Sequence, residues 1–220
     1  INHNGSIDEA KKLAELAASS GADIIKSQFH IPEEEMSNKA KNVVPPNANE
    51  SIYEIIEKCS LKIDEEYVFK EFIEDLGTEY LCTPFSAKAA HILGQMNVNA
   101  FKIGSGECNN FSVLEAATSY QKPLIISTGM NNISACRKTY NYVKEKIGEK
   151  IILLHTTNLY PTPYNLVRLG GISELSRISG DNVGLSDHTI SNLASLGAIA
   201  LGAILIERHF TDSKNRVGPD

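Results

Sequence analysis

Lysine and hydroxyl side chains stand at or near the ends of several short apolar runs in this sequence, where they could bind phosphate. Lys26 and Lys102 belong to two of these runs. Because like charges repel, two lysines that converge on one place indicate an anion between them. Hydroxyl groups, which donate hydrogen bonds to phosphate oxygens, occur in further runs at Thr83, Ser105, Ser127 and Ser186. One such hydroxyl could instead cap a helix, but the whole set predicts a phosphate site.

Two histidines of the last two runs, His188 and His209, could share one divalent metal ion. Adjacent strands lie roughly 4.8 Å apart, which brings two imidazoles within reach of a single ion. Glu107 could add a carboxylate directly or through water, and such a metal would polarise a carbonyl as a Lewis acid. The signal is weak, because a histidine is more often a hydrogen-bonded part of the structure. For His3 and His155 the sequence leaves open a catalytic or a packing role.

Polar side chains of the kind that bind a sugar accompany these groups. They are Gln28, Asn158, Tyr160 and Asp220. A buried polar group without its partner costs about 1–3 kcal/mol, so such contacts select for hydroxyl groups. The stretch 158–163 could alternatively be an ordinary turn stiffened by its two prolines.

The apolar runs alternate with helical patterns, which predicts parallel strands joined by crossover helices. Seven runs read as strands: 23–28, 80–83, 100–105, 123–127, 151–155, 182–188 and 204–209. A short segment at 1–3 is interpreted as the end of a first strand. Helices are expected at 6–20, 64–76, 86–94, 112–120, 134–147, 166–178 and 191–201. The fold class is therefore α/β, a (β/α)8 TIM barrel, whose active site is built at the carboxyl ends of its strands.

The length of 220 residues suits one TIM-barrel catalytic domain over 1–220, which we interpret as truncated at both ends. Residues 29–49 form a long irregular stretch after the strand that carries Lys26, and we expect an active-site loop there.

Composition argues against two kinds of partner and indicates a compartment. With 27 acidic and 21 basic residues the formal charge is -6, which argues against a nucleic-acid partner. No run approaches the roughly 20 apolar residues of a membrane span. The four cysteines lie far apart without a CxxC pair, as expected for reduced thiols in a cytoplasmic protein.

The motifs occur in an order that resembles the barrel domain of the bacterial sialic acid synthases (N-acetylneuraminate synthases) along the whole chain. Each tetrapeptide alone is a weak signal, but the ordered set is specific. The set comprises Asn2-His3-Asn4-Gly5, Lys26-Ser27-Gln28, Thr83-Pro84-Phe85, Lys102-Ile103-Gly104-Ser105-Gly106-Glu107, Ser127-Thr128-Gly129-Met130, Tyr160-Pro161-Thr162-Pro163, Leu185-Ser186-Asp187-His188-Thr189, Glu207-Arg208-His209-Phe210-Thr211-Asp212 and Gly218-Pro219-Asp220.

The resemblance implies condensation of phosphoenolpyruvate with N-acetylmannosamine and water, giving N-acetylneuraminate and phosphate, with manganese or another divalent metal. By position, phosphoenolpyruvate would be held by Lys26, Thr83, Lys102, Ser105, Ser127, Asn158 and Ser186. His188 and His209 would ligate the metal, with Glu107 beside it as the carboxylate that handles protons. Gln28, Asp220 and Tyr160 would contact the amino sugar.

Two features of the family are not part of this sequence. The family's small C-terminal antifreeze-like domain, which caps the partner's barrel in a homodimer, is not part of this sequence. The acidic residue that precedes the Asn-His-Asn-Gly motif in the family is not part of it either. We therefore expect a homodimer of the longer parent protein, and no turnover by residues 1–220 alone.

Three alternatives remain open on the sequence alone. The product could be a related nonulosonic acid, legionaminic or pseudaminic acid. Lys102 could instead form a Schiff base, as in an aldolase. A non-catalytic barrel that binds sugar phosphates is the third, and the presence of both His188 and His209 argues against it.

Overall fold

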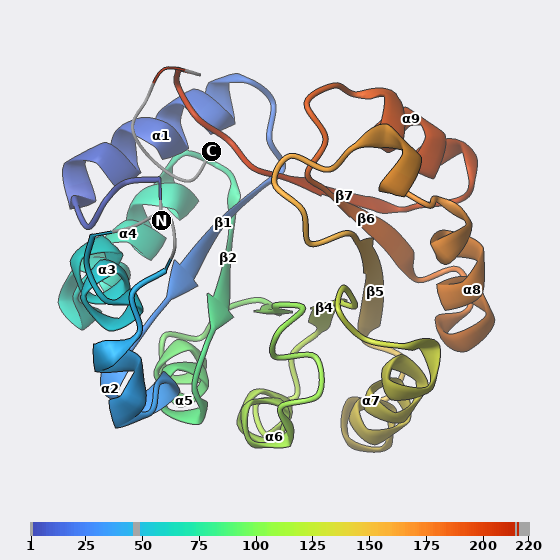
Figure 1. Cartoon of the computed structure of the whole chain (residues 1–220), viewed down its shortest axis with the longest axis horizontal. Coiled ribbons are helices and arrows are strands. Elements are labelled where there is room, and N and C mark those ends of the chain that lie inside the picture. The colour runs from blue at the N-terminus through green and yellow to red at the C-terminus, as the bar shows by residue number, and fades with distance from the viewer. Residues whose placement is uncertain (1, 46–48, 214, 216–220) are drawn as a thin grey trace. The chain divides into compact units, whose positions relative to one another are not determined.

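The computed structural model describes residues 2–45, 49–213 and 215, and throughout them helices alternate with parallel strands (Figure 1). The chain divides into two compact units. Unit 1 comprises residues 1–99 and 210–220, and unit 2 comprises residues 100–209.

Unit 1 holds one pair of strands and its covering helices. Strand β1 (Ile24–Phe29) pairs in parallel with β2 (Glu79–Pro84), so that Gln28 lies opposite Thr83. The helical segments are α1 (Ile7–Ser19), α2 (Pro32–Glu35), η1 (Asn38–Asn42), α3 (Ile52–Cys59), α4 (Ile63–Asp75) and α5 (Ala87–Gln95). Helices α4 and α5 both pack on β2, and α1 packs on α4.

A buried carboxyl group of α4 sets which way the side chains of β1 point. Glu66 is 1% exposed and accepts hydrogen bonds from Ser27 Oγ at 2.8 Å and from the hydroxyl of Tyr80. Burial raises the pKa of Glu66, and the bonds from Tyr80 and Ser27 oppose that rise. Because side chains alternate along a strand, Ser27 faces α4 while Lys26 and Gln28 point to the opposite side of the strand pair.

Unit 2 is a run of five parallel strands that pair in chain order, with helices along their outer side (Figure 1). The strands are β3 (Phe101–Ile103), β4 (Leu124–Ser127), β5 (Ile151–Thr156), β6 (Val183–Asp187) and β7 (Leu205–Arg208). The helical segments are α6 (Phe111–Thr118), α7 (Ile133–Ile147), η2 (Tyr164–Leu166), α8 (Gly170–Ser179) and α9 (Leu193–Ala200). Strands β3 and β4 are buried along their whole length, as expected for parallel strands covered on both faces.

The α/β barrel class expected from the sequence is confirmed by the alternation of parallel strands and helices, and all seven predicted strands are present. The predicted strand end at 1–3 is wrong for the residues that are described. Asn2 and His3 already belong to a turn that runs to Gly5, and in that turn Asn4 and Gly5 have positive φ.

The segment 29–49 was expected to be one irregular loop, but it contains the short helices α2 and η1. Helix α3 was not expected at all. Its signal was present in the sequence, because Ser51 and Glu54 form a capping box at its start. Within the described residues, no helix is both long and apolar enough to span a bilayer.

Candidate active site

A buried lysine forms the centre of a polar cluster in unit 2. Lys102 of β3 is 2% exposed, and its Nζ donates hydrogen bonds to Ser127 Oγ of β4 at 2.7 Å and to the Ile103 carbonyl at 3.0 Å. The carboxylate of Glu207 on β7 lies 3.7 Å from the same Nζ. A buried ammonium group is tolerated when it is paired and hydrogen-bonded in this way. Two residues that the sequence assigned to phosphate, Lys102 and Ser127, are thus in direct contact.

The carboxylate of Glu207 links this lysine to the next strand. Its Oε1 accepts a hydrogen bond from Ser186 Oγ at 2.9 Å, and Ser186 Oγ lies 3.4 Å from His188 Nε2. A continuous polar chain therefore runs from Ser127 through Lys102, Glu207 and Ser186 to His188. Glu207 was not among the site residues predicted from the sequence. Its position on β7 two residues before His209, which directly follows that strand, was a usable signal, because residues two apart in an extended segment share a face.

Three loops of unit 2 meet around a glycine next to this cluster. A methyl group placed on Gly129 would lie 1.8 Å from Asn158 Oδ1 and 2.9 Å from Ser105 Oγ. Asn131 fixes two of these loops, because its Nδ2 donates to the carbonyls of Ser105 at 2.9 Å and Gly129 at 2.7 Å. The predicted binding residues Ser105 and Asn158 are therefore brought together by the absence of a side chain at Gly129.

The side-chain oxygen of Asn158 points to a ligand. Asn158 Oδ1 is buried and has no hydrogen-bond partner in the described structure. Buried polar atoms are nearly always paired, so an unpaired one calls for a partner from a ligand or a water. Because an amide oxygen only accepts hydrogen bonds, the partner must donate one, as a sugar hydroxyl or a water does.

The two predicted metal-binding histidines lie together and share an aromatic neighbour. The ring centroids of His188 and His209 are 5.0 Å apart. Tyr160 stacks on both, with centroid distances of 4.2 Å to His188 and 5.3 Å to His209. Tyr160 lies in the loop after β5, the same loop that carries Asn158, and its peptide bond to Pro161 is cis.

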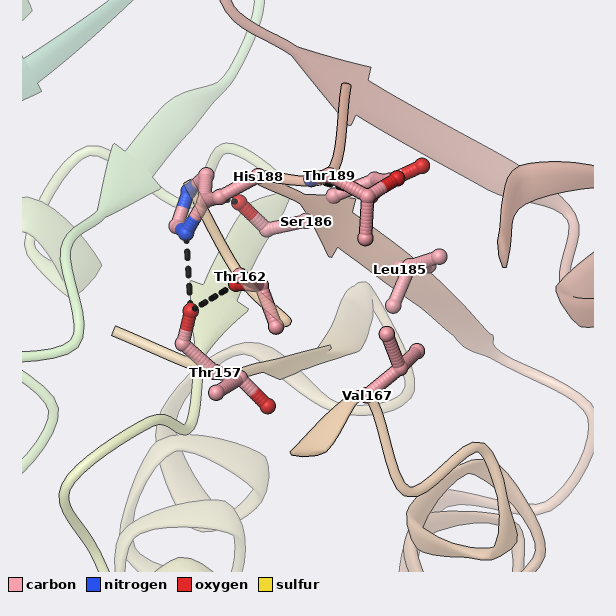
Figure 2. A pocket seen from close by; sticks show the side chains of 8 residues that line it. Thr157, Thr162, Val167, Leu185, Ser186, His188 and Thr189 are labelled. Carbon is pink, nitrogen blue, oxygen red and sulfur yellow. Dashed lines mark hydrogen bonds between the residues drawn. The ribbon is translucent and has the colours of Figure 1, made fainter. Parts of the chain in front are cut away.

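A backbone carbonyl fixes the orientation of His188. Figure 2 shows His188 Nδ1 pointing to the Thr157 carbonyl, which also accepts a hydrogen bond from Thr162 Oγ1. The two distances are 2.9 and 3.2 Å. The same residues line a small pocket beside the end of β6. With Nδ1 donating to the carbonyl, Nε2 is the nitrogen that faces the polar cluster.

The contacts of His188 match those of a metal-binding histidine, and the divalent ion shared with His209 stays a prediction. A histidine that binds a metal through one nitrogen commonly donates its other N–H to a carbonyl, as His188 does. No third histidine, cysteine or carboxylate joins them in a metal-binding group among the described residues. Glu107 is half-buried and accepts a hydrogen bond from Asn110 Nδ2. Its place beside a metal remains a prediction.

The other predicted site residues belong to unit 1 or lie outside the described residues. Gln28 and Thr83 are register partners on β1 and β2, and Thr83 Oγ1 is a second buried side-chain atom without a partner. Lys26 is half-buried and shares the face of Gln28. Asp220 lies outside the described residues.

The two histidines whose role the sequence left open, His155 and His3, make packing and backbone contacts. His155 Nε2 donates to the Val167 carbonyl at 2.7 Å, and its ring lies against Gly171. His3 is 8% exposed, and its Nδ1 accepts a hydrogen bond from the Gly5 amide at 3.1 Å. Burial is the main cause that lowers the pKa of His3 to about 4, which keeps the ring neutral at physiological pH.

Parallel strands that carry a lysine, hydroxyls and paired histidines towards their carboxyl ends are typical of the active site of an α/β-barrel enzyme. Comparison with known proteins then identifies the family: residues 13–220 match the NeuB family model, and the chain belongs to the NeuB family.

Two relatives and one solved structure show how closely the chain resembles known members. It is 40% identical to an uncharacterized protein of Methanocaldococcus jannaschii, covering 100% of this chain and 62% of that protein. It is 37% identical to the N,N'-diacetyllegionaminic acid synthase of Campylobacter jejuni, covering 100% of this chain and 68% of that protein. The crystal structure of an N-acetylneuraminic acid synthetase from Leptospira borgpetersenii in complex with citrate superimposes with a TM-score of 0.85 at 26% identity. That alignment covers 96% of this chain and 70% of the other. The chain thus spans about two thirds of the length of these relatives.

Proposed function

We propose that the protein makes a nonulosonic acid by condensing phosphoenolpyruvate with a 2-acetamido sugar and water. The observation that carries the proposal is the polar chain from Ser127 through Lys102, Glu207 and Ser186 to His188 at the strand ends of unit 2, in which Lys102 and Glu207 form an ion pair. It places a cation and hydroxyl donors next to a pair of imidazoles, as this reaction needs. Membership of the NeuB family supports the same reaction class.

The residues of the cluster would act on the phosphate end of the substrate. Lys102 is a buried cation with a hydroxyl partner, so water does not screen its charge. Phosphate leaves when the bond from C2 to the bridging oxygen breaks, and negative charge then grows on the departing oxygens. A fixed ammonium and fixed hydroxyl groups stabilise that charge without reorganising. Ser105, Ser127, Asn158 and Ser186 would hold the remaining oxygens, together with Lys26 and Thr83.

A divalent ion, with manganese as the first candidate, would be held by His188 and His209. When bound it would supply Lewis-acid polarisation of the sugar aldehyde. Carbon 3 of phosphoenolpyruvate forms the new bond to the aldehyde carbon, the C=O bond opens and its oxygen takes up a proton to become a hydroxyl, and water adds at C2. The proton that this water loses needs an acceptor, and Glu107 is the residue that we propose for it.

The acceptor sugar proposed first is N-acetylmannosamine, which Gln28, Tyr160 and Asp220 would contact. A diacetamido hexose is the second candidate. The identity of 37% to a diacetyllegionaminic acid synthase favours it. Both acceptors would use the same phosphoenolpyruvate chemistry.

The test is turnover by the protein in its natural length. The protein is incubated with phosphoenolpyruvate labelled with ¹⁸O in the bridging oxygen, with each sugar in turn, and with manganese or EDTA. Mass spectrometry should find a nonulosonic acid with one sugar, label in the released phosphate, and loss of product in EDTA that manganese restores. The variant K102M should lose the activity, because the buried cation is removed. Consumption of phosphoenolpyruvate that places the label in the keto acid would contradict the mechanism.

The resemblance also leads us to propose that the natural-length protein is a homodimer in the cytoplasm. Light scattering coupled to size exclusion would test the first point, since a monomer at micromolar concentration contradicts it. Fractionation of cells of the source organism would test the second.

A further inference from the structure

A histidine and a carboxylate that the proposed mechanism does not use lie behind Gln28 in unit 1. His30 Nδ1 is 2.8 Å from Glu35 Oε1, and His30 Nε2 is 3.3 Å from the side-chain oxygen of Gln28. The three residues form a relay in the order Glu35, His30, Gln28. Gln28 is on β1, His30 follows that strand directly, and Glu35 closes the short helix α2.

The imidazole in the middle of the relay is held rigidly. The side chains of His30 and Glu35 are only 6% and 8% exposed. The ring of His30 also stacks on Phe85, with centroids 4.1 Å apart and an angle of 20° between the planes. An ionised carboxylate can only accept hydrogen bonds, so Glu35 holds a proton on Nδ1 of His30. Nε2 of the ring then accepts a hydrogen bond from the Gln28 amide when that amide is turned so that its nitrogen faces the ring.

The relay faces the side of β1 on which the predicted substrate residues lie. Ser27 points to α4, so Gln28 and His30 point the other way, and Thr83 lies opposite Gln28 in register. Two atoms of this group, Thr83 Oγ1 and Glu35 Oε2, are buried without a hydrogen-bond partner. A network that served the fold alone would be expected to satisfy its own members. These two atoms therefore indicate that a hydrogen-bonding ligand or water completes the group.

We propose that Glu35 and His30 are positioning residues for the acceptor sugar, because they hold the Gln28 amide in one rotamer. With one end of that amide bonded to His30, the other end is presented to a polar group of the sugar. Neither Glu35 nor His30 contacts the sugar in this proposal. The inference rests on the proposed function, in which Gln28 contacts the acceptor. It predicts that the relay sets the affinity for the sugar and not that for phosphoenolpyruvate.

Four variants of the natural-length protein separate positioning from folding. H30F keeps an aromatic ring to stack on Phe85 but removes both ring nitrogens. H30Q returns a polar group near the place of Nε2. E35Q removes the charge of the relay, and E34Q is its matched control, because Glu34 is exposed on the same helix and pairs with Lys88 at 3.0 Å.

The expected result is a split between the two Michaelis constants. H30F and E35Q should raise KM for the sugar by about tenfold, with KM for phosphoenolpyruvate and the melting temperature close to wild type. H30Q should recover part of the loss, and E34Q should behave as wild type. Equal KM values for the sugar in H30F and wild type would overturn the inference, as would a rise in both KM values together with a lower melting temperature.

A second measurement does not depend on turnover. The side-chain amide of Gln28, identified in ¹H–¹⁵N spectra by its loss in Q28M, should have a shifted resonance in wild type. In H30F its chemical shift should move to that of a glutamine side chain without a fixed rotamer. An unchanged Gln28 resonance in H30F would overturn the relay itself. Absence of turnover with every sugar, while this resonance does respond, would instead count against the proposed function and limit the inference to the orientation of Gln28.

Discussion

At the scale of single residues, position 129 requires a glycine because neighbouring side chains leave no space for a Cβ atom, and not because of its backbone conformation. It does not have a positive φ, so alanine could adopt its conformation. A methyl group there would nevertheless meet the side-chain oxygens of Asn158 and Ser105. Both are proposed to bind the phosphate end of the substrate, so a very small change at residue 129 should displace two binding groups together.

We therefore predict that G129A weakens binding of phosphoenolpyruvate by at least tenfold. The matched control is G106A, because a methyl group at Gly106 would meet only the end of the Met130 side chain at 3.9 Å. Titration calorimetry with phosphoenolpyruvate measures both variants. Equal weakening in G129A and G106A would show that the crowding at residue 129 has no bearing on the ligand.

A second prediction at this scale concerns pH. The pKa of His3 is lowered from 6.5 to about 4 in the folded chain, mainly by burial. The unfolded chain therefore binds the proton more tightly, so stability is complete above pH 6.5 and falls as the pH drops from 6.5 towards 4. The loss should amount to roughly 2–3 kcal/mol by pH 4.

The variant H3N tests this prediction, because asparagine retains an acceptor for the Gly5 amide but does not titrate. Urea unfolding of wild type and H3N at several pH values should show a steeper acid loss in wild type. Curves that stay parallel between pH 7 and pH 4.5 would assign that loss to other groups.

The site residues that the sequence predicted and those that it missed differ in what places them in the site. Lys102, Ser127, Ser186 and His188 stand at strand ends, and the alternation of strands and helices was enough to bring them together. Glu207 was missed although its spacing from His209 was readable, whereas His30 was missed because its ring is held by a stack on Phe85, which is remote in sequence. No periodicity along the chain reports such contacts.

At the scale of elements, helix α8 is fitted to strand β5 through a glycine. A methyl group on Gly171 would lie 2.5 Å from Nδ1 of His155, whose ring is tied to the Val167 carbonyl and cannot easily move. Gly170 is next to it in the same helix, and a methyl group there would meet nothing within 4 Å. Substitution of each glycine by alanine therefore separates the effect of helix propensity on stability from the effect of packing.

We predict that G171A lowers the free energy of unfolding by about 1–3 kcal/mol through overpacking. G170A should change it little or raise it by up to about 1 kcal/mol, because alanine favours the helix. Denaturant unfolding at pH 7 measures both variants. A stability of G171A equal to that of G170A would mean that His155 can move aside.

Strands and long helices were predictable because their hydrophobic periods are strong, whereas the first turn and the short helices were not. Asn2–Gly5 forms a turn through the positive φ values of Asn4 and Gly5, although its residue types did not exclude a strand. Helices α2 and η1 have four and five residues, too few for a period to be recognised. Helix α3 did carry a readable capping box in Ser51 and Glu54.

At the scale of the whole molecule, an acidic chain with a formal charge of -6 is proposed to bind a multiply charged anion. The proposal therefore depends on local cations and donors, and these are distributed over both compact units. Lys102, Ser105, Ser127, Asn158 and Ser186 belong to unit 2, and Lys26 and Thr83 to unit 1. The sequence assigns all seven to one ligand.

That assignment predicts the pattern of hydrogen exchange when phosphoenolpyruvate is bound. Exchange should slow in the segments that carry the proposed ligands in both units, namely 24–29, 79–84, 101–106, 124–131, 156–160 and 183–188. Because a ligand that binds only the folded state stabilises the elements it contacts, saturation at about 100 times Kd should add up to about 2.7 kcal/mol in those segments. In K102M the slowing should disappear everywhere, since the shared ligand is lost. Slowing confined to residues 100–209 would remove Lys26 and Thr83 from the phosphate site while leaving the cluster around Lys102 in place.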